Sequence, residues 1–237
     1  MNCLLIESNE LADPSNRIRV TGRRRRHAEE ILRASPGDTL RVGVVGGRLG
    51  TARIVGLDEE TLDLEVELDR DPPPKRDLQL VLALPRPPVF RRLLSTVASL
   101  GVESLLVVGT ARTEKSFWQS HVVEPAAVRE RLLLGLEQAG DTVLPAVEFH
   151  RYFESLLEEV LPTRLAGRRG FVAHPGATRP CPHAVREPVT VFIGPEGGLV
   201  DYEVERLGGV GFEAVGLGPR VLRVEPVIPL LIGRLCD

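Results

Sequence analysis

The sequence predicts an α/β protein in two parts, a small β-rich N-terminal part and a larger C-terminal part with a mostly parallel sheet. Residues 61–69 alternate between apolar and polar side chains at a period of two, which is typical of a half-buried strand. From residue 78 onward, continuous apolar runs alternate with segments of helical periodicity, as in a parallel sheet with crossover helices. The proline-rich stretch 71–75 separates the two patterns. We therefore expect domains at 1–71 and 72–237.

The N-terminal part is expected to fold as a small β-barrel with an arginine-rich edge. Residues 39–45 predict a strand that ends at the Gly46-Gly47 turn, and residues 49–55 predict its hairpin partner. A short helix is expected from His27 to Leu32. Residues 17–53 contain ten arginines and three acidic residues, which favours a surface for nucleic acid.

The C-terminal part alternates strands and helices. Strands are expected at 78–84, 102–108, 142–149, 170–173, 189–193 and 213–217. Helices are expected from Val89 to Leu100, from Pro125 to the Gly140 cap, at 152–161, at 202–207 and at the C-terminal end, near Leu235.

The composition excludes several classes of protein. The 237 residues are 43% hydrophobic and 27% charged with a net charge of −3, which is typical of a globular chain. No apolar run is long enough to span a membrane, and the first residues do not resemble a secretion signal. The three cysteines are widely spaced and form no Cys-x-x-Cys pair, so we expect a cytoplasmic protein.

Three glycine- and proline-rich loops follow predicted strands of the C-terminal part. They are 174–176, 194–198 and 218–223. Ligands of open α/β sheets bind beyond the carboxyl ends of the strands, and glycine lets the backbone approach a ligand closely. Glycine and proline also simply end strands, but three such loops, one with a carboxylate and one with two arginines, favour a binding site.

Common catalytic motifs are absent from the sequence. It contains no phosphate-binding P-loop, dinucleotide fingerprint, Gly-x-Ser-x-Gly elbow or His-Glu-x-x-His motif. His174, Cys181 and His183 lie close together but lack the spacing of a zinc site, so no metal is expected.

A specific combination of motifs occurs in the C-terminal part: Ile193-Gly194-Pro195-Glu196-Gly197-Gly198-Leu199, Tyr202-Glu203, Gly211-Phe212 and the stretch from Leu217 to Glu225. This combination resembles the RsmE family, SPOUT-class methyltransferases that modify the N3 position of one uridine in bacterial small-subunit ribosomal RNA. The resemblance extends to Leu100-Gly101-Val102, the basic loop 112–116, the helix segment 136–139, and residues 25–38 at the start of the family's N-terminal barrel.

The resemblance implies a fold and a cofactor. The N-terminal part would be a PUA-like RNA-binding β-barrel, and the C-terminal part a SPOUT α/β domain with a deep trefoil knot that works as a homodimer. S-adenosylmethionine would bind among the knot loops, through glycine backbone and the apolar walls of Leu217 and Leu222. The implied cofactor residues are His174, Gly176, Ile193, Gly194, Pro195, Glu196, Gly197, Gly198, Leu217, Gly218, Val221, Leu222 and Arg223.

The same resemblance suggests roles in methyl transfer. Arg220 and Arg223 would stabilise negative charge on the uracil oxygens and contact phosphate. Glu225, or less favourably Glu196, would accept the N3 proton. Glu225 could instead interact with a helix N-terminus, and Glu196 could instead hold the glycine loop through backbone amides.

The sequence departs from the family after Glu225. The family usually continues with Thr-Ala, whereas this chain has Pro226-Val227-Ile228-Pro229. Proline removes an amide donor, although it is accommodated in the first turn of a helix. The departure bears on cofactor affinity.

Arginines and one lysine are the expected RNA contacts. These are Arg23, Arg24, Arg25, Arg26, Arg41, Arg112 and Lys115. Phe117 and Trp118 would either stack on a splayed base or be buried at a dimer interface.

Two alternative functions remain beside rRNA (uracil-N3) methylation. One is a SPOUT methyltransferase with another RNA target, for instance a ribose hydroxyl. The other is a non-catalytic RNA-binding or ribosome-assembly protein whose altered segment after Glu225 has lost the cofactor.

Overall fold

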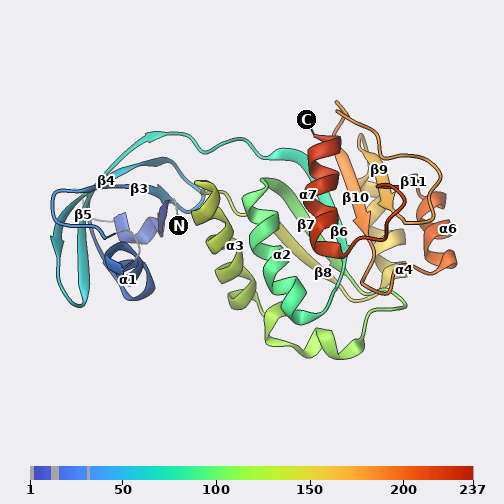
Figure 1. The fold of residues 1–237 in the computed structure, drawn as a ribbon, viewed down its shortest axis with the longest axis horizontal. Helices are drawn as coiled ribbons and strands as arrows, with labels where there is room; N and C mark the ends of the chain where they lie inside the picture. The colour runs from blue at the N-terminus through green and yellow to red at the C-terminus, as the bar shows by residue number, and fades with distance from the viewer. Residues whose placement is uncertain (1–2, 12–15, 31–32, 237) are drawn as a thin grey trace. The chain divides into compact units, whose positions relative to one another are not determined.

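The computed structural model describes residues 3–11, 16–30 and 33–236 (Figure 1). The chain forms two compact units, and we describe each separately. The N-terminal unit comprises residues 1–74 together with 133–144, and the C-terminal unit comprises residues 75–132 and 145–237. The architecture is mixed α/β, as the sequence predicts.

The N-terminal unit contains a five-stranded sheet in the order β1-β3-β4-β5-β2. The strands are β1 (Leu4–Ile6), β2 (Arg17–Thr21), β3 (Thr39–Val44), β4 (Leu49–Leu57) and β5 (Thr61–Arg70), with η1 (Ser8–Leu11) and α1 (Gly22–Glu30) between them. Strand β1 runs parallel to β3, and the other neighbours are antiparallel. Leu62, Leu64 and Val66 of β5 are buried in one core with residues of β2 and β4, as the period of two in β5 predicted.

Two features of this unit differ from the sequence prediction. Strands β1 and β2 were not predicted. Strand β1 has only three residues, whereas the alternation of arginines with Ile18 and Val20 in β2 is a strand signal that the prediction overlooked. Helix α1 begins at Gly22, five residues before the predicted start, while residues 31–32 of the predicted helix lie outside the described residues.

The end of α3 (Pro125–Ala139) and the residues after it complete the N-terminal unit. The amide of Cys3 donates to the Glu137 carbonyl at 3.0 Å, and that of Gly46 donates to the Thr142 carbonyl at 2.8 Å. The Thr142 hydroxyl in turn donates to the Gly47 carbonyl at 2.5 Å. This segment therefore satisfies backbone groups at the start of β1 and in the β3–β4 hairpin.

The C-terminal unit contains a six-stranded sheet in the order β11-β9-β10-β6-β7-β8. The strands are β6 (Arg76–Ala83), β7 (Val102–Val108), β8 (Ala146–His150), β9 (Arg169–Ala173), β10 (Val189–Ile193) and β11 (Phe212–Val215). Every neighbouring pair is parallel. The carboxyl ends of all six strands therefore lie along one edge, which is the arrangement that brings strand-end loops together.

Helices pack against this sheet. They are α2 (Pro87–Ser99), the first part of α3, α4 (Phe153–Ser155), α5 (Leu161–Arg164), α6 (Asp201–Gly209) and α7 (Val224–Leu235), with short turns η2 (Lys115–Gln119) and η3 (His121–Val123). Val81, Leu106 and Phe192 of the sheet share a core with residues of α4, α5 and α6, and α2 and α7 lie beside one another (Figure 1).

The predicted helix at 152–161 is interrupted. A π turn, η4 (Leu156–Val160), joins α4 to α5. Pro162 lies in the first turn of α5 and has no N–H to donate to a carbonyl in the preceding turn. The wider π turn accommodates this missing bond.

Candidate functional site

Three loops enclose a cavity at the carboxyl edge of the parallel sheet. They follow β9, β10 and β11, which are neighbours in the order β11-β9-β10. The cavity has a volume of about 460 Å³, within the range of small-molecule sites. Its walls come from the ends of these strands, from the three loops and from the start of α7.

Most residues of the predicted cofactor set line this cavity. The lining includes His174, Ile193, Gly194, Pro195, Glu196, Gly197, Gly198, Leu217, Gly218, Val221, Leu222 and Arg223, and also Arg220. Gly176 is not among the lining residues; its amide donates to Nδ1 of His174 at 3.2 Å and so closes the turn after β9. Glu225 is also outside the lining.

Sequence reasoning missed several lining residues. These are Ala173, Pro175, Leu199, Val215, Val224 and Val227. They are the apolar neighbours of the predicted loop residues, and the rule that strand ends build the site would have included them. Arg112, which the sequence assigned to RNA contact, lines the cavity as well.

The glycines of the 194–199 loop permit a tight turn. The amide of Gly198 donates to the Pro195 carbonyl at 2.8 Å, and Gly198 has a φ of +75°, a conformation that favours glycine. A Cβ added at Gly194 would lie 3.0 Å from Cγ of Leu199. These positions explain why the loop carries glycine and why its backbone faces the cavity without side chains.

Arg112 connects the loop after β7 to the glycine turn. Its Nη1 donates to the Gly197 carbonyl at 2.5 Å. A Cβ on Gly197 would lie 3.3 Å from both Cβ and Cδ of Arg112. Close packing of these two residues therefore depends on the absence of a side chain at Gly197.

Glu203 is a buried carboxylate that supports the same loop. Only 3% of the residue is exposed. One oxygen accepts from the Ala111 amide at 2.7 Å, and the other accepts from the Val200 amide at 3.0 Å. Because Ala111 precedes Arg112, Glu203 holds the segment from which Arg112 reaches Gly197. Its place in the first turn of α6 also favours negative charge.

The two candidate proton acceptors have protein partners. Oε1 of Glu196 accepts from the backbone amide of Arg86 at 3.0 Å, which ties the glycine loop to the start of α2. Oε1 of Glu225 accepts from Nη2 of Arg92 at 2.8 Å. The Arg92 guanidinium holds the pKa of the Glu225 carboxyl below its usual range.

Pro226 is the third residue of α7. The amides of the first helical turn have no intrahelical acceptor, so proline at this position removes no helical hydrogen bond. Val227 is buried and lines the cavity beside Val224. The departure from Thr-Ala therefore gives the cavity an apolar wall while leaving the helix start intact.

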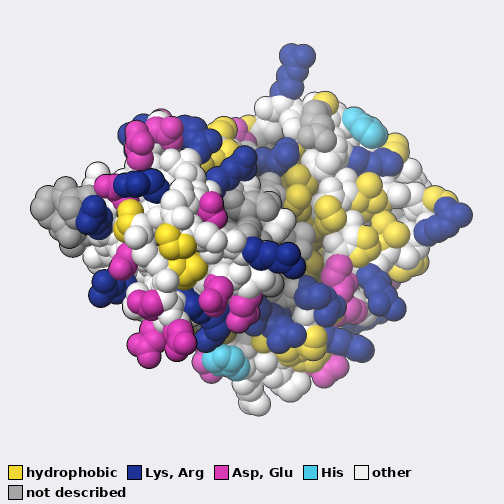
Figure 2. Space-filling view, turned by 60° about the vertical axis from the view of Figure 1, so that its left-hand side comes forward, with side chains coloured by type: hydrophobic (Ala, Val, Ile, Leu, Met, Phe, Trp, Pro, Cys, Tyr) yellow, Lys and Arg dark blue, Asp and Glu magenta, His cyan; other side chains and the backbone are white. Residues whose placement is uncertain are grey.

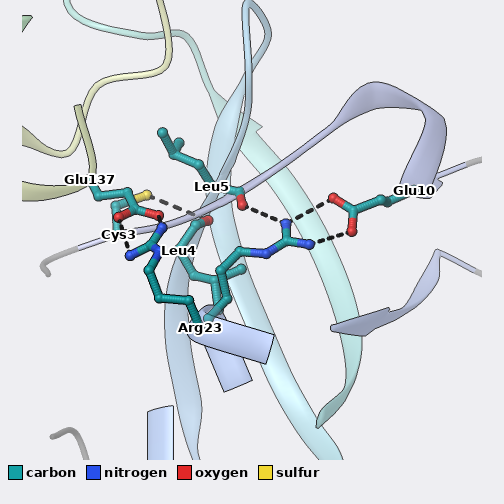
Figure 3. A network of polar contacts seen from close by, with 7 residues as sticks. Cys3, Leu4, Leu5, Glu10, Arg23 and Glu137 are labelled. Atoms are coloured by element: carbon teal, nitrogen blue, oxygen red, sulfur yellow. Dashed lines mark hydrogen bonds and ion pairs between the residues drawn. The ribbon is translucent and has the colours of Figure 1, made fainter. Parts of the chain in front are cut away.

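Three of the predicted RNA-binding arginines are engaged within the N-terminal unit. Arg23 forms two hydrogen bonds to the Glu137 carboxylate, and Arg24 forms two to the Glu10 carboxylate and one to the Leu5 carbonyl (Figure 3). Arg25 is buried, and its guanidinium is bonded to Glu29 and to the Asp58 carbonyl. Because Arg25 is buried, it is not part of the exposed surface that the sequence predicted to bind RNA phosphate.

The remaining predicted RNA contacts are Arg26, Arg41 and Lys115, and all three are exposed. Figure 2 shows that lysine and arginine side chains on the visible face are interspersed with aspartate and glutamate. The arginine excess of the sequence is thus divided between internal ion pairs and exposed cations. Trp118 is half-buried and packs edge-on against Phe149, with ring centroids 6.3 Å apart.

Two further observations concern possible metal ligands and the Cys3 thiol. Among residues 3–11, 16–30 and 33–236, no group of three or more His, Cys, Asp or Glu side chains has the arrangement of a metal site. Burial raises the pKa of the Cys3 thiol to about 11, so it stays protonated at neutral pH. Within the same described segments, no helix is both long and apolar enough to cross a membrane.

The sequence and the fold match a class of RNA-modifying enzymes. Residues 72–234 match the family described as RNA methyltransferase domain. Ribosomal RNA small subunit methyltransferase E of Treponema pallidum is 32% identical over 230 residues, covering 95% of this chain and 86% of that protein. The chain belongs to the ribosomal RNA small subunit methyltransferase E family.

Two further proteins extend the comparison. The enzyme of the same name from Mycobacterium tuberculosis is 26% identical over 213 residues, covering 87% of this chain and 81% of that protein. The crystal structure of ribosomal RNA small subunit methyltransferase E from Neisseria gonorrhoeae, bound to S-adenosylmethionine, has a TM-score of 0.73 at 23% identity. The match covers 97% of this chain and 95% of that one, so the fold is shared over nearly its whole length.

Proposed function

We propose that this protein transfers a methyl group from S-adenosylmethionine to N3 of a uridine in small-subunit ribosomal RNA. The observation that carries the proposal is the single cavity built by the loops after β9, β10 and β11. It unites nearly all residues that the family resemblance assigns to the cofactor. The relatives are named for methylation of small-subunit ribosomal RNA, which supports the substrate class and a cytoplasmic place of action.

The cavity has the properties needed for S-adenosylmethionine. Ile193, Leu199 and Leu217 supply apolar walls for an adenine ring. Gly194, Gly197 and Gly198 line the cavity and carry no side chains, so the backbone of this tight turn can approach the ligand closely. When bound, the cofactor supplies an electrophilic methyl group. Gly176 would act indirectly, by closing the His174 turn.

The side chains around the cavity position the uridine and its charge. Arg220 and Arg223 line the cavity and are exposed, so they can contact RNA phosphate and the uracil oxygens. Donors fixed there stabilise charge that develops as the N3 proton leaves. In-line placement of the two reactants supplies much of the rate increase.

Glu225 is our candidate for the proton acceptor. Its ion pair with Arg92 keeps it ionised, which is the state that accepts a proton. Glu196 is the alternative acceptor. It lines the cavity, and one of its carboxylate oxygens accepts from the Arg86 amide, as one oxygen of Glu225 accepts from Arg92.

The two units would divide the work. The five-stranded sheet and its enclosed core support a PUA-like barrel that binds RNA, and we assign this role to residues 1–71. Exposed Arg26 and Arg41 of this part would contact RNA phosphate together with Lys115 of the second part. We assign methyl transfer to residues 72–237. Arg23 and Arg24 would support RNA binding indirectly, through their ion pairs within the N-terminal unit.

A trefoil knot and a homodimer complete the proposal. The amides of Ala184 and Val185, between β9 and β10, donate to the carbonyls of Arg234 and Leu235 at the end of α7. This contact holds the segment before β10 against α7, and we assign the knotted path from the family resemblance. Leu230 is an exposed apolar side chain on α7, and we assign the homodimer from the family resemblance.

Labelled methyl transfer tests the reaction. Small ribosomal subunits from a strain lacking this protein are incubated with the enzyme and labelled S-adenosylmethionine, with free rRNA in parallel. We expect label in 3-methyluridine by mass spectrometry of the nucleosides. Label in a ribose-methylated nucleoside would support a different RNA target. Absence of label, together with binding to the subunit and no calorimetric heat from the cofactor, would support a non-catalytic RNA-binding protein.

A further inference from the structure

A second cavity lies within the N-terminal unit. Its volume is about 420 Å³, and it is bordered by β1, η1, the junction of β2 with α1, and the end of α3. None of its lining residues belongs to the loops after β9, β10 and β11. Leu5, Val45 and Leu133 give it apolar surface, while Asn9 and Thr21 add neutral polar groups.

Arg23 presents a rigidly held guanidinium to this cavity. Its Nη1 and Nη2 lie 3.0 and 2.7 Å from the two carboxylate oxygens of Glu137 (Figure 3). The Glu137 side chain is only 3% exposed, whereas that of Arg23 is 47% exposed. The buried carboxylate therefore fixes the plane of a guanidinium that remains partly open to the solvent.

The charge of the cavity disfavours phosphate. Arg24 is held by both oxygens of Glu10, at 2.8 and 2.6 Å, and by the Leu5 carbonyl at 2.9 Å. Glu10 also accepts from the Glu7 amide at 2.7 Å. Three glutamates and two arginines line the cavity, so its formal charge is −1. An anion entering it would compete with carboxylates already bonded to both arginines.

We propose that this cavity binds an unpaired nucleobase of ribosomal RNA that carries an exocyclic amino group. A flat base stacks on an arginine plane, and single-stranded RNA is recognised by splaying such bases into pockets. The apolar side chains cover the base, and the oxygens of Asn9 and the carboxylates accept from its amino group. Uracil has no amino donor. The inference rests on the proposed function in taking RNA as the ligand.

Titration of the full-length protein with nucleosides tests the cavity without S-adenosylmethionine or ribosomes. Cytidine, adenosine, guanosine and uridine are each added while backbone amide signals are followed by NMR, with inorganic phosphate as a fifth probe. We expect cytidine, adenosine or guanosine to shift the amides of Thr21 and Val45 with at least fivefold higher affinity than uridine. Equal shifts with uridine, or shifts with phosphate alone, would overturn the proposal.

A substitution that fills the cavity with a bulky side chain tests the same proposal by mutation. Thr21 is exposed where β2 meets α1 and lines the cavity, whereas Thr51 is exposed on β4 of the same sheet and does not. Thr21→Trp is expected to abolish the nucleoside shifts, and Thr51→Trp to retain them. Asn9→Ala, a small change at an exposed position, is expected to weaken them severalfold. If neither Thr21→Trp nor Asn9→Ala alters the shifts, the base does not bind here.

Methyl transfer then separates this proposal from the proposed function. Thr21→Trp is expected to raise the KM for small subunits at least tenfold and to leave the dissociation constant of S-adenosylmethionine unchanged. An unchanged KM would overturn the role of the cavity in RNA binding. If the wild-type protein transfers no methyl group at all, the proposed function fails, while the nucleoside titration still decides whether the cavity binds a base.

Discussion

At the residue scale, Gly197 joins the glycine turn to Arg112. Any side chain here would push against Cβ and Cδ of Arg112, which a Cβ approaches to 3.3 Å. We expect Gly197→Leu to raise the dissociation constant of S-adenosylmethionine at least tenfold in calorimetric titration. The control is Gly208→Leu at the end of α6, where an added Cβ meets nothing within 4 Å. Equal loss in both variants would show that the loop geometry is not what binds the cofactor.

The Arg92–Glu225 pair makes a prediction about pH. Because Arg92 lowers the pKa of Glu225, the pair stabilises the fold above the ordinary glutamate range of about pH 4.3. That stabilisation is lost as the pH falls through the lowered pKa. In Arg92→Gln the pKa of Glu225 returns toward its usual value. We therefore expect the acidic limb in a plot of kcat against pH to move to higher pH in this variant.

The control for this profile is Arg91→Gln. Arg91 is the exposed neighbour of Arg92 on α2, and its replacement is expected to leave the acidic limb in place. If Arg92→Gln also leaves the limb in place, Glu225 does not accept the N3 proton.

At the element scale, α7 contains two prolines in different environments. Pro226 lies in the first turn, where the amides have no helical acceptor, and Pro229 lies inside the helix. Pro229 is exposed and removes a bond to the carbonyl of Glu225. We expect Pro229→Ala to increase the free energy of unfolding by about 1–3 kcal/mol, measured by denaturant titration. Pro226→Ala serves as the comparison and is expected to change it by less than about 1 kcal/mol.

Elements with strong periodicity could be predicted from the sequence, and elements defined by distant partners could not. The apolar runs of β6, β7 and β10 identify buried strands, because parallel strands are covered on both faces. Strand β1 is only three residues long and exists through its parallel pairing with β3. The π turn before α5 depends on Pro162 inside an otherwise helical pattern.

At the scale of the whole molecule, RNA affinity and cofactor affinity are expected to respond to different substitutions. Arg26 and Arg41 are exposed, and we propose that each contacts one phosphate. Replacing both with glutamine is expected to reduce the slope of log affinity against log salt by about 1.5 and to leave cofactor binding unchanged. Filter binding at several salt concentrations measures the slope.

The control for the salt slope is Arg53→Gln. Nη2 of Arg53 is bonded to Glu65 at 2.7 Å on the same sheet, so this arginine is already neutralised. An equal reduction of the slope by Arg53→Gln would show that the effect follows net charge and not phosphate contact.

The part of the candidate site that lies at the carboxyl edge of the parallel sheet could be predicted from the sequence. Loops after parallel strands meet at that edge, so residues 193–198 and 217–223 could be grouped before their positions were known. The roles of Glu203 and Arg112 could not be predicted, because they depend on hydrogen bonds between segments about 90 residues apart. The sequence also could not predict the ion pairs of three arginines, which are Arg23, Arg24 and Arg25. A high number of arginines in a segment does not indicate which carboxylate lies near each of them in the fold.

Because the N-terminal unit is built from two separate segments of the chain, it cannot finish folding until the second segment has been synthesised. Residues 1–74 emerge first, but Glu137, which pairs with Arg23, and Thr142, which bonds the β3–β4 hairpin, are made much later. Translation of the intervening 70 residues up to Leu144 takes roughly 4 to 14 s. During that interval the guanidinium of Arg23, the Gly47 carbonyl and the Gly46 amide lack these partners. The part of the chain that leaves the ribosome first can therefore reach its final structure only after residues 133–144 have been made.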